Sequence, residues 1–172
     1  SAQDSGGKSL AVKSYINNDG KDSSGYMNTP AVMLVNAAVF AAGGNRVEIG
    51  NGDRILHNEY YPWDNVLMDD ELKAGMRNVY DFAVAYENLL RDGQTTTDQK
   101  VVVENYPAST TGESNKIWTY TREGNGYQML HLINLLGTDN EWRDTEKTKA
   151  APTQVSNLAV KYYYTGDVNS VY

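Results

Sequence analysis

The sequence predicts an α/β part followed by an all-β part. Residues 1–94 contain a strand-like run, an apolar helical run and a second strand-like run, which together indicate a strand, helix, strand unit. A strongly amphipathic helical run follows them. In residues 95–172 helical periodicity gives way to short strand-like runs between turn residues. We therefore place the domain boundary between residues 94 and 95.

The first unit is built around an apolar helix. Residues 9–16 (SLAVKSYI) have the composition of a strand buried on both faces. After a turn-rich loop, Thr29 is predicted as the N-cap and Pro30 as the first helical residue. Residues 31–42 are apolar nearly all round and end at the glycine pair 43–44, which predicts a deeply packed helix.

A short second strand and a long helix complete the α/β part. Residues 46–49 are predicted as a strand, with a right-handed crossover from the first strand. The second helix opens at residues 68–70, where two aspartates suit the positive end of its dipole, and stops at residues 91–93. Its apolar positions recur at helical spacing: Leu72, Met76, Val79, Ala83, Tyr86 and Leu90.

The all-β part is predicted from alternation and turns. Residues 95–99 (TTTDQ) are interpreted as a linker. The turn at residues 123–126 (EGNG) is predicted to join two strands as a hairpin. The predicted strands are residues 100–104, 117–122, 127–135 and 158–164.

Composition excludes several classes of function. The chain has 172 residues, a formal net charge of −7 and no Lys/Arg cluster, which argues against binding nucleic acid. It has no cysteine, so disulfides and thiol catalysis are excluded, and no apolar run has the length of a membrane span. The chain has 13 Tyr and only 2 Phe, which favours aromatic surfaces partly exposed to water, of the kind on which sugar rings stack.

The polar loop after residues 46–49 is the best candidate site, since loops at the carboxyl ends of parallel strands carry ligands and chemistry. Glu48, Asp53 and Glu59 are carboxylates in or beside it, and paired carboxylates are typical of glycosidic chemistry. In the alternative, which we favour, Glu48 pairs with Arg46 or with a partner in the interior of a barrel, and Glu59 caps a turn.

Other candidate side chains have ordinary explanations. His57 would orient a substrate hydroxyl or be incidental, and His131 is predicted to be structural. Residues 50–53 (GNGD) lack the terminal glutamate of a calcium loop, so neither a metal nor a cofactor is predicted. Strand aromatics would form a sugar platform or, more commonly, pack a core. These are Trp118, Trp142 and residues 162–164.

Longer runs of sequence resemble a known family. Residues 27–93, with EYYP at residues 59–62 and FAVAYENLLRDG at residues 82–93, closely resemble glycoside hydrolase family 66, the endo-dextranases and cyclodextran-forming glucanotransferases. The earlier VKSYIN and the later IWTYTREGNGYQMLHLINLLGTDNEWRDT look like the same family in the same order. The resemblance covers nearly the whole chain.

The resemblance implies a retaining enzyme that acts on α-1,6-linked glucans such as dextran or isomaltooligosaccharides. It implies a (β/α)8 barrel followed by a β-sandwich, with residues 10–16 as the seventh barrel strand and residues 47–49 as the eighth. The family's aspartate nucleophile and glutamate acid/base lie on earlier strands, upstream of Ser1, so neither maps onto this chain. We expect a fragment of a longer bacterial extracellular or periplasmic enzyme, inactive and unstable without the rest of its barrel.

By the same resemblance, side chains at the barrel mouth are expected to contact glucose units. The expected set is Tyr15, Asn17, Glu48, Asn51, Asp53, His57 and Tyr60. A dextran hydrolase is the first hypothesis and a cyclising transferase the second. The transferases carry an inserted carbohydrate-binding module, for which the connections 17–29 and 43–46 are too short, and this mildly favours the hydrolase. The third hypothesis is a non-catalytic glycan-binding or structural fragment.

Overall fold

The computed structural model describes residues 10–16, 25–57, 66–142 and 149–172. Strand β1 (Ala11–Lys13) pairs in parallel with β2 (Asn45–Val47), and helix α1 (Thr29–Ala41) connects them. The predicted strand, helix, strand unit is therefore confirmed. Both strands are shorter than predicted, because the chain beyond Val47 folds into a hairpin instead of extending the parallel ladder.

The two ends of α1 use different capping devices. Asn28, and not Thr29 as predicted, is the N-cap: its Oδ1 accepts a hydrogen bond from the Ala31 amide at 2.9 Å. At the other end, Gly43 adopts a φ of 78°. Its amide donates to the Phe40 carbonyl and the Gly44 amide donates to the Val39 carbonyl, both at 2.9 Å. This Schellman arrangement explains the glycine pair.

The second helix is divided in two. Helix α2 (Asp70–Ala85) starts at Asp69, whose Oδ1 accepts from the Leu72 amide at 2.8 Å. The sequence predicts one helix to Leu90, but Tyr86 leaves helical geometry at φ −116° and ψ 20°. The last turn, α3 (Glu87–Leu90), is reoriented so that Leu90 is buried.

The main apolar core lies between the helices and the segments at the carboxyl ends of the parallel strands. Part of the predicted polar loop contributes to it, because β3 (Arg54–Ile55) pairs antiparallel with β4 (Val66–Leu67) and buries Ile55 and Val66. The core residues are Ile16, Met27, Ala31, Val32, Val35, Ile55, Val66, Met68, Leu72 and Met76.

The all-β part is organised by one hairpin. Strands β8 (Ile117–Gly124) and β9 (Tyr127–Asn134) pair antiparallel across Asn125 and Gly126, whose positive φ angles of 53° and 80° make the predicted Asn-Gly turn. Short strand β7 (Ala108–Ser109) pairs in parallel with β8.

The predicted linker at residues 95–99 is wrong. Residues Thr95–Thr97 form β5, which pairs antiparallel with β8. The Thr97 hydroxyl donates to the Thr121 hydroxyl at 3.0 Å. Threonine is both a polar and a β-forming residue, and here the strand partner decides between the two.

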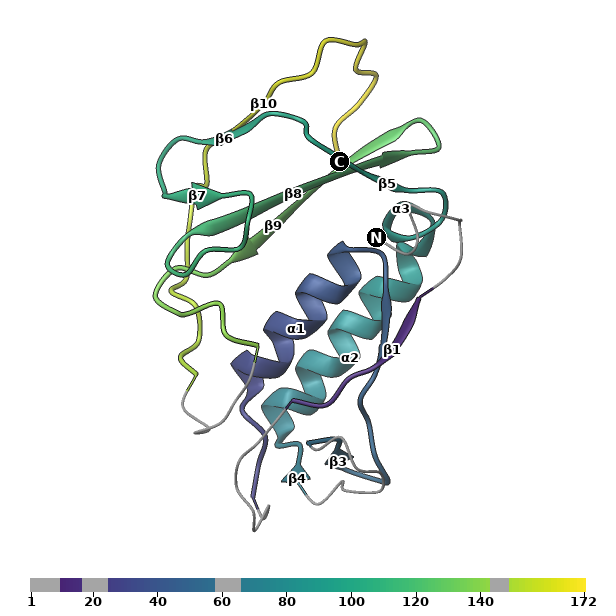
Figure 1. The fold of residues 1–172 in the computed structure, drawn as a ribbon, viewed down its shortest axis with the longest axis vertical. Helices are drawn as coiled ribbons and strands as arrows, with labels where there is room; N and C mark the ends of the chain where they lie inside the picture. Colours follow the sequence, from purple (N-terminus) through teal and green to yellow (C-terminus); the bar gives the residue numbers. More distant parts are fainter. Residues whose placement is uncertain (1–9, 17–24, 58–65, 143–148) are drawn as a thin grey trace.

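The hairpin lies between the helices and a smaller sheet (Figure 1). Helices α1 and α3 contact β9. On the other side, β6 (Val101–Val103) pairs antiparallel with β10 (Val160–Tyr162). Crossing a membrane would need a longer and more apolar helix than any in the described ranges.

Candidate functional site

The carboxyl ends of β1 and β2 meet at one edge, because the two strands are parallel. The Ser14 amide, just after β1, donates to the Val47 carbonyl at 3.2 Å. Tyr15 and the segment that follows Val47 therefore leave the sheet side by side. In α/β sheets this is the edge at which ligands bind.

A tight hairpin, residues 48–56, follows β2. The Leu56 amide donates to the Glu48 carbonyl at 2.7 Å, and the Gly50 amide donates to the Arg54 carbonyl at 2.8 Å. Gly52, at the tip, takes a φ of 63°. The tip residues Asn51 and Asp53 are exposed to solvent.

Helix α2 holds the tip in place. The Lys73 ammonium lies 2.8 Å from Asp53 Oδ2, and the Met68 amide donates to the Asp53 carbonyl at 2.8 Å. The ion pair is largely exposed, so its energetic value is small. The backbone bond nevertheless fixes Asp53 relative to the start of the helix.

Beneath the hairpin lies a buried polar cluster, which we call the Arg46–Glu48 cluster: Asn36, Arg46, Glu48 and Tyr80. The side chains of Arg46 and Glu48 form an ion pair and are both 0% exposed. Arg46 Nη1 also donates to Asn36 Oδ1 at 2.8 Å, and the Tyr80 hydroxyl donates to the Arg46 carbonyl at 2.8 Å. The predicted pairing of Glu48 with Arg46 is confirmed.

Burial dominates the electrostatics of this cluster. It raises the pKa of Glu48 to about 7, against the attraction of the Arg46 guanidinium and hydrogen bonds from Asn36 and Tyr80. Burial, followed by the nearby Glu48 charge, raises the pKa of Tyr80 to about 12. The pKa of Arg46 is lowered by burial. The Glu48 carboxyl therefore changes charge near neutral pH while Arg46 stays charged.

The expected glucan contacts separate into three groups. Tyr15 is half-buried, while Asn51 and Asp53 are exposed. Glu48 and His57 are buried, at 0% and 2% exposure, so a sugar would reach them only if their covering segments moved. Asn17 and Tyr60 lie outside the described residues, as does Glu59.

Sequence reasoning missed Asn36 and Tyr80 as partners of Glu48. The available signal was Asn36, a polar residue in the middle of an otherwise apolar helix, because such a residue is normally hydrogen-bonded. Tyr80 gave no signal, since its position in α2 also suits simple packing.

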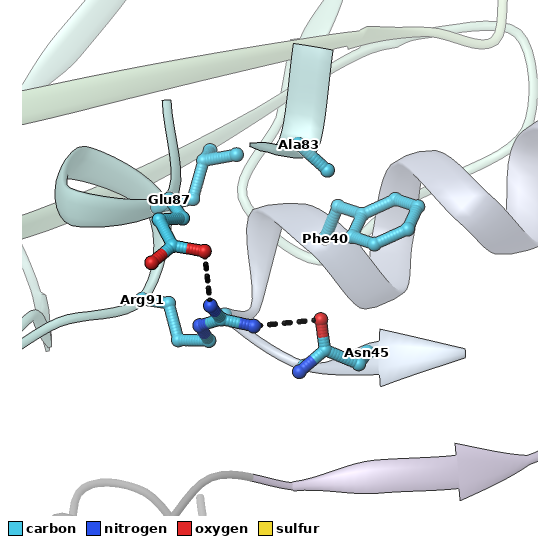
Figure 2. A pocket seen from close by; sticks show the side chains of 8 residues that line it. Phe40, Asn45, Ala83, Glu87 and Arg91 are labelled. Atoms are coloured by element: carbon cyan, nitrogen blue, oxygen red, sulfur yellow. Dashed lines mark hydrogen bonds and ion pairs between the residues drawn. The ribbon is translucent and has the colours of Figure 1, made fainter. Parts of the chain in front are cut away.

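A small hollow lies at the opposite, amino end of β2 (Figure 2). There Arg91 donates to Asn45 Oδ1 at 2.9 Å and to Glu87 Oε2 at 2.7 Å, beside Phe40 and Ala83. These contacts fasten α3 to the start of β2. Because ligands bind α/β sheets at the carboxyl ends of the strands, we interpret this hollow as structural.

The strand aromatics divide between packing and exposure. Trp118 and Tyr120 have ring centroids 6.3 Å apart, and Tyr120 and His131 have centroids 6.1 Å apart. Burial lowers the pKa of His131 to about 4, which fits the structural role predicted for it. Of the aromatics predicted to form a sugar platform or a core, Trp142, Tyr163 and Tyr164 are exposed, and Trp118 and Tyr162 are partly buried.

Comparison with known proteins identifies the family. The family model for glycosyl hydrolase family 66 matches residues 1–172. The chain belongs to glycosyl hydrolase family 66. A cycloisomaltooligosaccharide glucanotransferase of Niallia circulans is 36% identical over 154 residues, covering 86% of the chain and 16% of that protein. A dextranase of Streptococcus salivarius is 28% identical over 192 residues, covering 93% of the chain and 23% of that protein.

A solved structure of the same family supports the fold. It is the cycloisomaltooligosaccharide glucanotransferase of Paenibacillus sp. complexed with cycloisomaltoheptaose. The TM-score is 0.77 at 31% identity, over 86% of this chain and 21% of that one. The family 66 chain thus spans about a quarter or less of the proteins it matches. Its fold is consistent with a fragment of the glucanotransferase fold.

Proposed function

We propose that this chain forms the late wall of the glucan cleft in a retaining, endo-dextranase-like glycoside hydrolase that cleaves α-1,6-glucosidic linkages. One observation carries the proposal: the exposed Asn51 and Asp53 and the half-buried Tyr15 gather at the carboxyl edge of a parallel β-pair in a family 66 chain. Their amide, carboxylate and phenol groups suit sugar hydroxyls and rings. Asn17 and Tyr60 belong to the same proposed set.

The β-pair supports a barrel as its setting. Helices cover one face of the pair, while Val47 and Ile49 on the other face are 55% and 46% exposed. In the proposal this face lines the inside of a (β/α)8 barrel, with β1 and β2 as its seventh and eighth strands. The rest of the barrel is then the partner of this segment, and residues 95–172 begin a β-sandwich.

The catalytic carboxylates of the proposed enzyme lie on the other barrel strands. The segment described here binds and orients the glucan, and the proposal requires neither metal nor cofactor. An extracellular or periplasmic location suits a polymer that is too large to enter the cell.

A cyclising glucanotransferase is the second candidate. It is favoured by two relatives of that name from Niallia circulans, which are 36% and 33% identical, against 28% for the dextranase. In that enzyme a glucan hydroxyl attacks in place of water. The third candidate applies to the isolated chain: a non-catalytic fragment that binds glycan or has a structural role.

An assay on dextran tests these proposals. The longer parent enzyme is expected to release reducing sugar, and the purified 172-residue chain is expected to release none. Reducing-sugar release by the chain alone would show that its catalytic carboxylates are present after all. Chromatography of the parent's products then separates the candidates, because a hydrolase yields linear isomaltooligosaccharides and a transferase yields cyclic ones.

A further inference from the structure

We propose that the Arg46–Glu48 pair positions Tyr15 and the 48–56 hairpin at the carboxyl edge of the β-pair. The inference rests on the proposed function and assigns Glu48 a role other than direct contact with the sugar. The pair is fully buried: Arg46, in β2, contacts α1 and Ser14 just after β1, and Glu48 contacts Tyr80 of α2.

Arg46 holds the end of β1. Its Nη2 donates to the Ser14 carbonyl at 3.3 Å, one residue before Tyr15. Its Nη1 donates to Asn36 Oδ1 at 2.8 Å and reaches the Val32 carbonyl at 3.4 Å, so the same guanidinium also contacts α1. A planar, five-donor group is suited to bridging several acceptors in this way, and a lysine is not.

Glu48 holds the base of the 48–56 hairpin. Its carboxylate contacts Arg46, and the Tyr80 hydroxyl lies 3.5 Å from Oε1. Its main-chain carbonyl accepts from the Leu56 amide at 2.7 Å, so fixing the side chain fixes the closing pair of the hairpin that carries Asn51 and Asp53. The position of the exposed tip is thus set from within the fold.

A purely structural role would be served better by apolar side chains, since a buried ion pair is a poor source of stability. Three neighbouring groups lower the pKa of Glu48: Arg46 of β2, the neutral Asn36 of α1 and Tyr80 of α2. Burial outweighs them and raises the pKa of Glu48 to about 7. Ionisable side chains with strongly shifted pKa values are common at functional sites.

Kinetics of the parent enzyme on dextran test the inference. Glu48→Gln keeps the shape of the side chain and removes its charge, and Arg46→Lys keeps the charge and removes the bridge to Ser14. Both are expected to raise KM by about tenfold with a smaller change in kcat, because they displace substrate-contacting loops by a fraction of an ångström. Glu48→Gln should also remove an ionisation near pH 7 from the pH profile of kcat/KM.

Glu87→Gln is the control for the loss of an ion pair elsewhere in the chain. It neutralises the acid of the Arg91–Glu87 pair, 2.7 Å apart at the amino end of β2 and remote from the hairpin. Its KM and pH profile are expected to match those of the wild type. A rise in KM equal to that of Glu48→Gln would overturn the inference, because any lost ion pair would then have the same effect.

Amide hydrogen exchange gives a readout that needs no substrate. In Glu48→Gln the amides of Gly50 and Leu56 are expected to exchange faster, while amides of the β8–β9 hairpin keep their protection. The inference requires both this local change and the rise in KM, and the absence of either one overturns it. If the wild type does not act on dextran, the proposed function fails, and exchange alone then decides whether the pair holds the hairpin.

Discussion

The chemistry of Glu48 shows why residue type alone does not locate a site. At the end of β2 and just after it, Arg46 and Glu48 are buried while Val47 and Ile49 are exposed, which is the period-two alternation of extended chain. Alternation does not say which face meets the helices. The charged pair occupies the helix side, where Asn36 and Tyr80 supply partners that strand periodicity cannot identify.

Glu48 should make the parent enzyme's stability depend on pH. Its folded pKa of about 7 exceeds its ordinary 4.5, so its contribution to stability is fully present below about pH 4.5 and is lost as the pH rises through 7. A shift of this size corresponds to roughly 3 kcal/mol. Thermal unfolding from pH 4.5 to 8 should show Glu48→Gln losing this dependence and matching or exceeding the wild type at pH 8. Parallel pH curves for the two proteins would contradict this assignment.

At the scale of elements, long periodic runs were predictable and their ends were not. The apolar helix, the amphipathic helix and the Asn-Gly hairpin were all found from spacing and turn chemistry. The β3–β4 pair was missed because each strand has two residues, too few to show any period. Adjacent Asn28 and Thr29 are both good caps, and only the backbone conformation selects between them.

The N-cap of α1 can be tested by substitution. Asn28 caps the helix through Oδ1, and its Nδ2 donates to the Lys149 carbonyl at 3.1 Å, linking the two predicted domains. Asn28→Ala in the parent enzyme is expected to cost about 1 to 2 kcal/mol of unfolding free energy, measured from the denaturant midpoint. Asn28→Asp keeps the cap and should cost less. Thr29→Ala is the control, and an equal loss there would mean that Thr29 is the cap after all.

At the scale of the whole molecule, helices cover one face of the β-pair and leave the other face exposed. Helices α1 and α2 bury Arg46 and Glu48 on the covered face. On the other face, Val47 and Ile49 leave β-branched apolar surface in solvent, which small stable sheets avoid. The sequence predicted that the first strand, residues 9–16, is buried on both faces, and a barrel around the second face would provide that burial.

Substitution of Val47 tests this arrangement in the parent enzyme. If Val47 faces the barrel interior, Val47→Asp buries a carboxylate there, and even with Lys13 as its register partner the expected loss is about 1 to 3 kcal/mol of unfolding free energy. Val84→Asp is the matched control, because Val84 lies on α2 with 71% exposure and would remain on the outside of a barrel. Equilibrium unfolding should therefore rank Val47→Asp far below Val84→Asp. If both variants unfold at the same midpoint, the open face of the β-pair is a true surface and the barrel proposal fails.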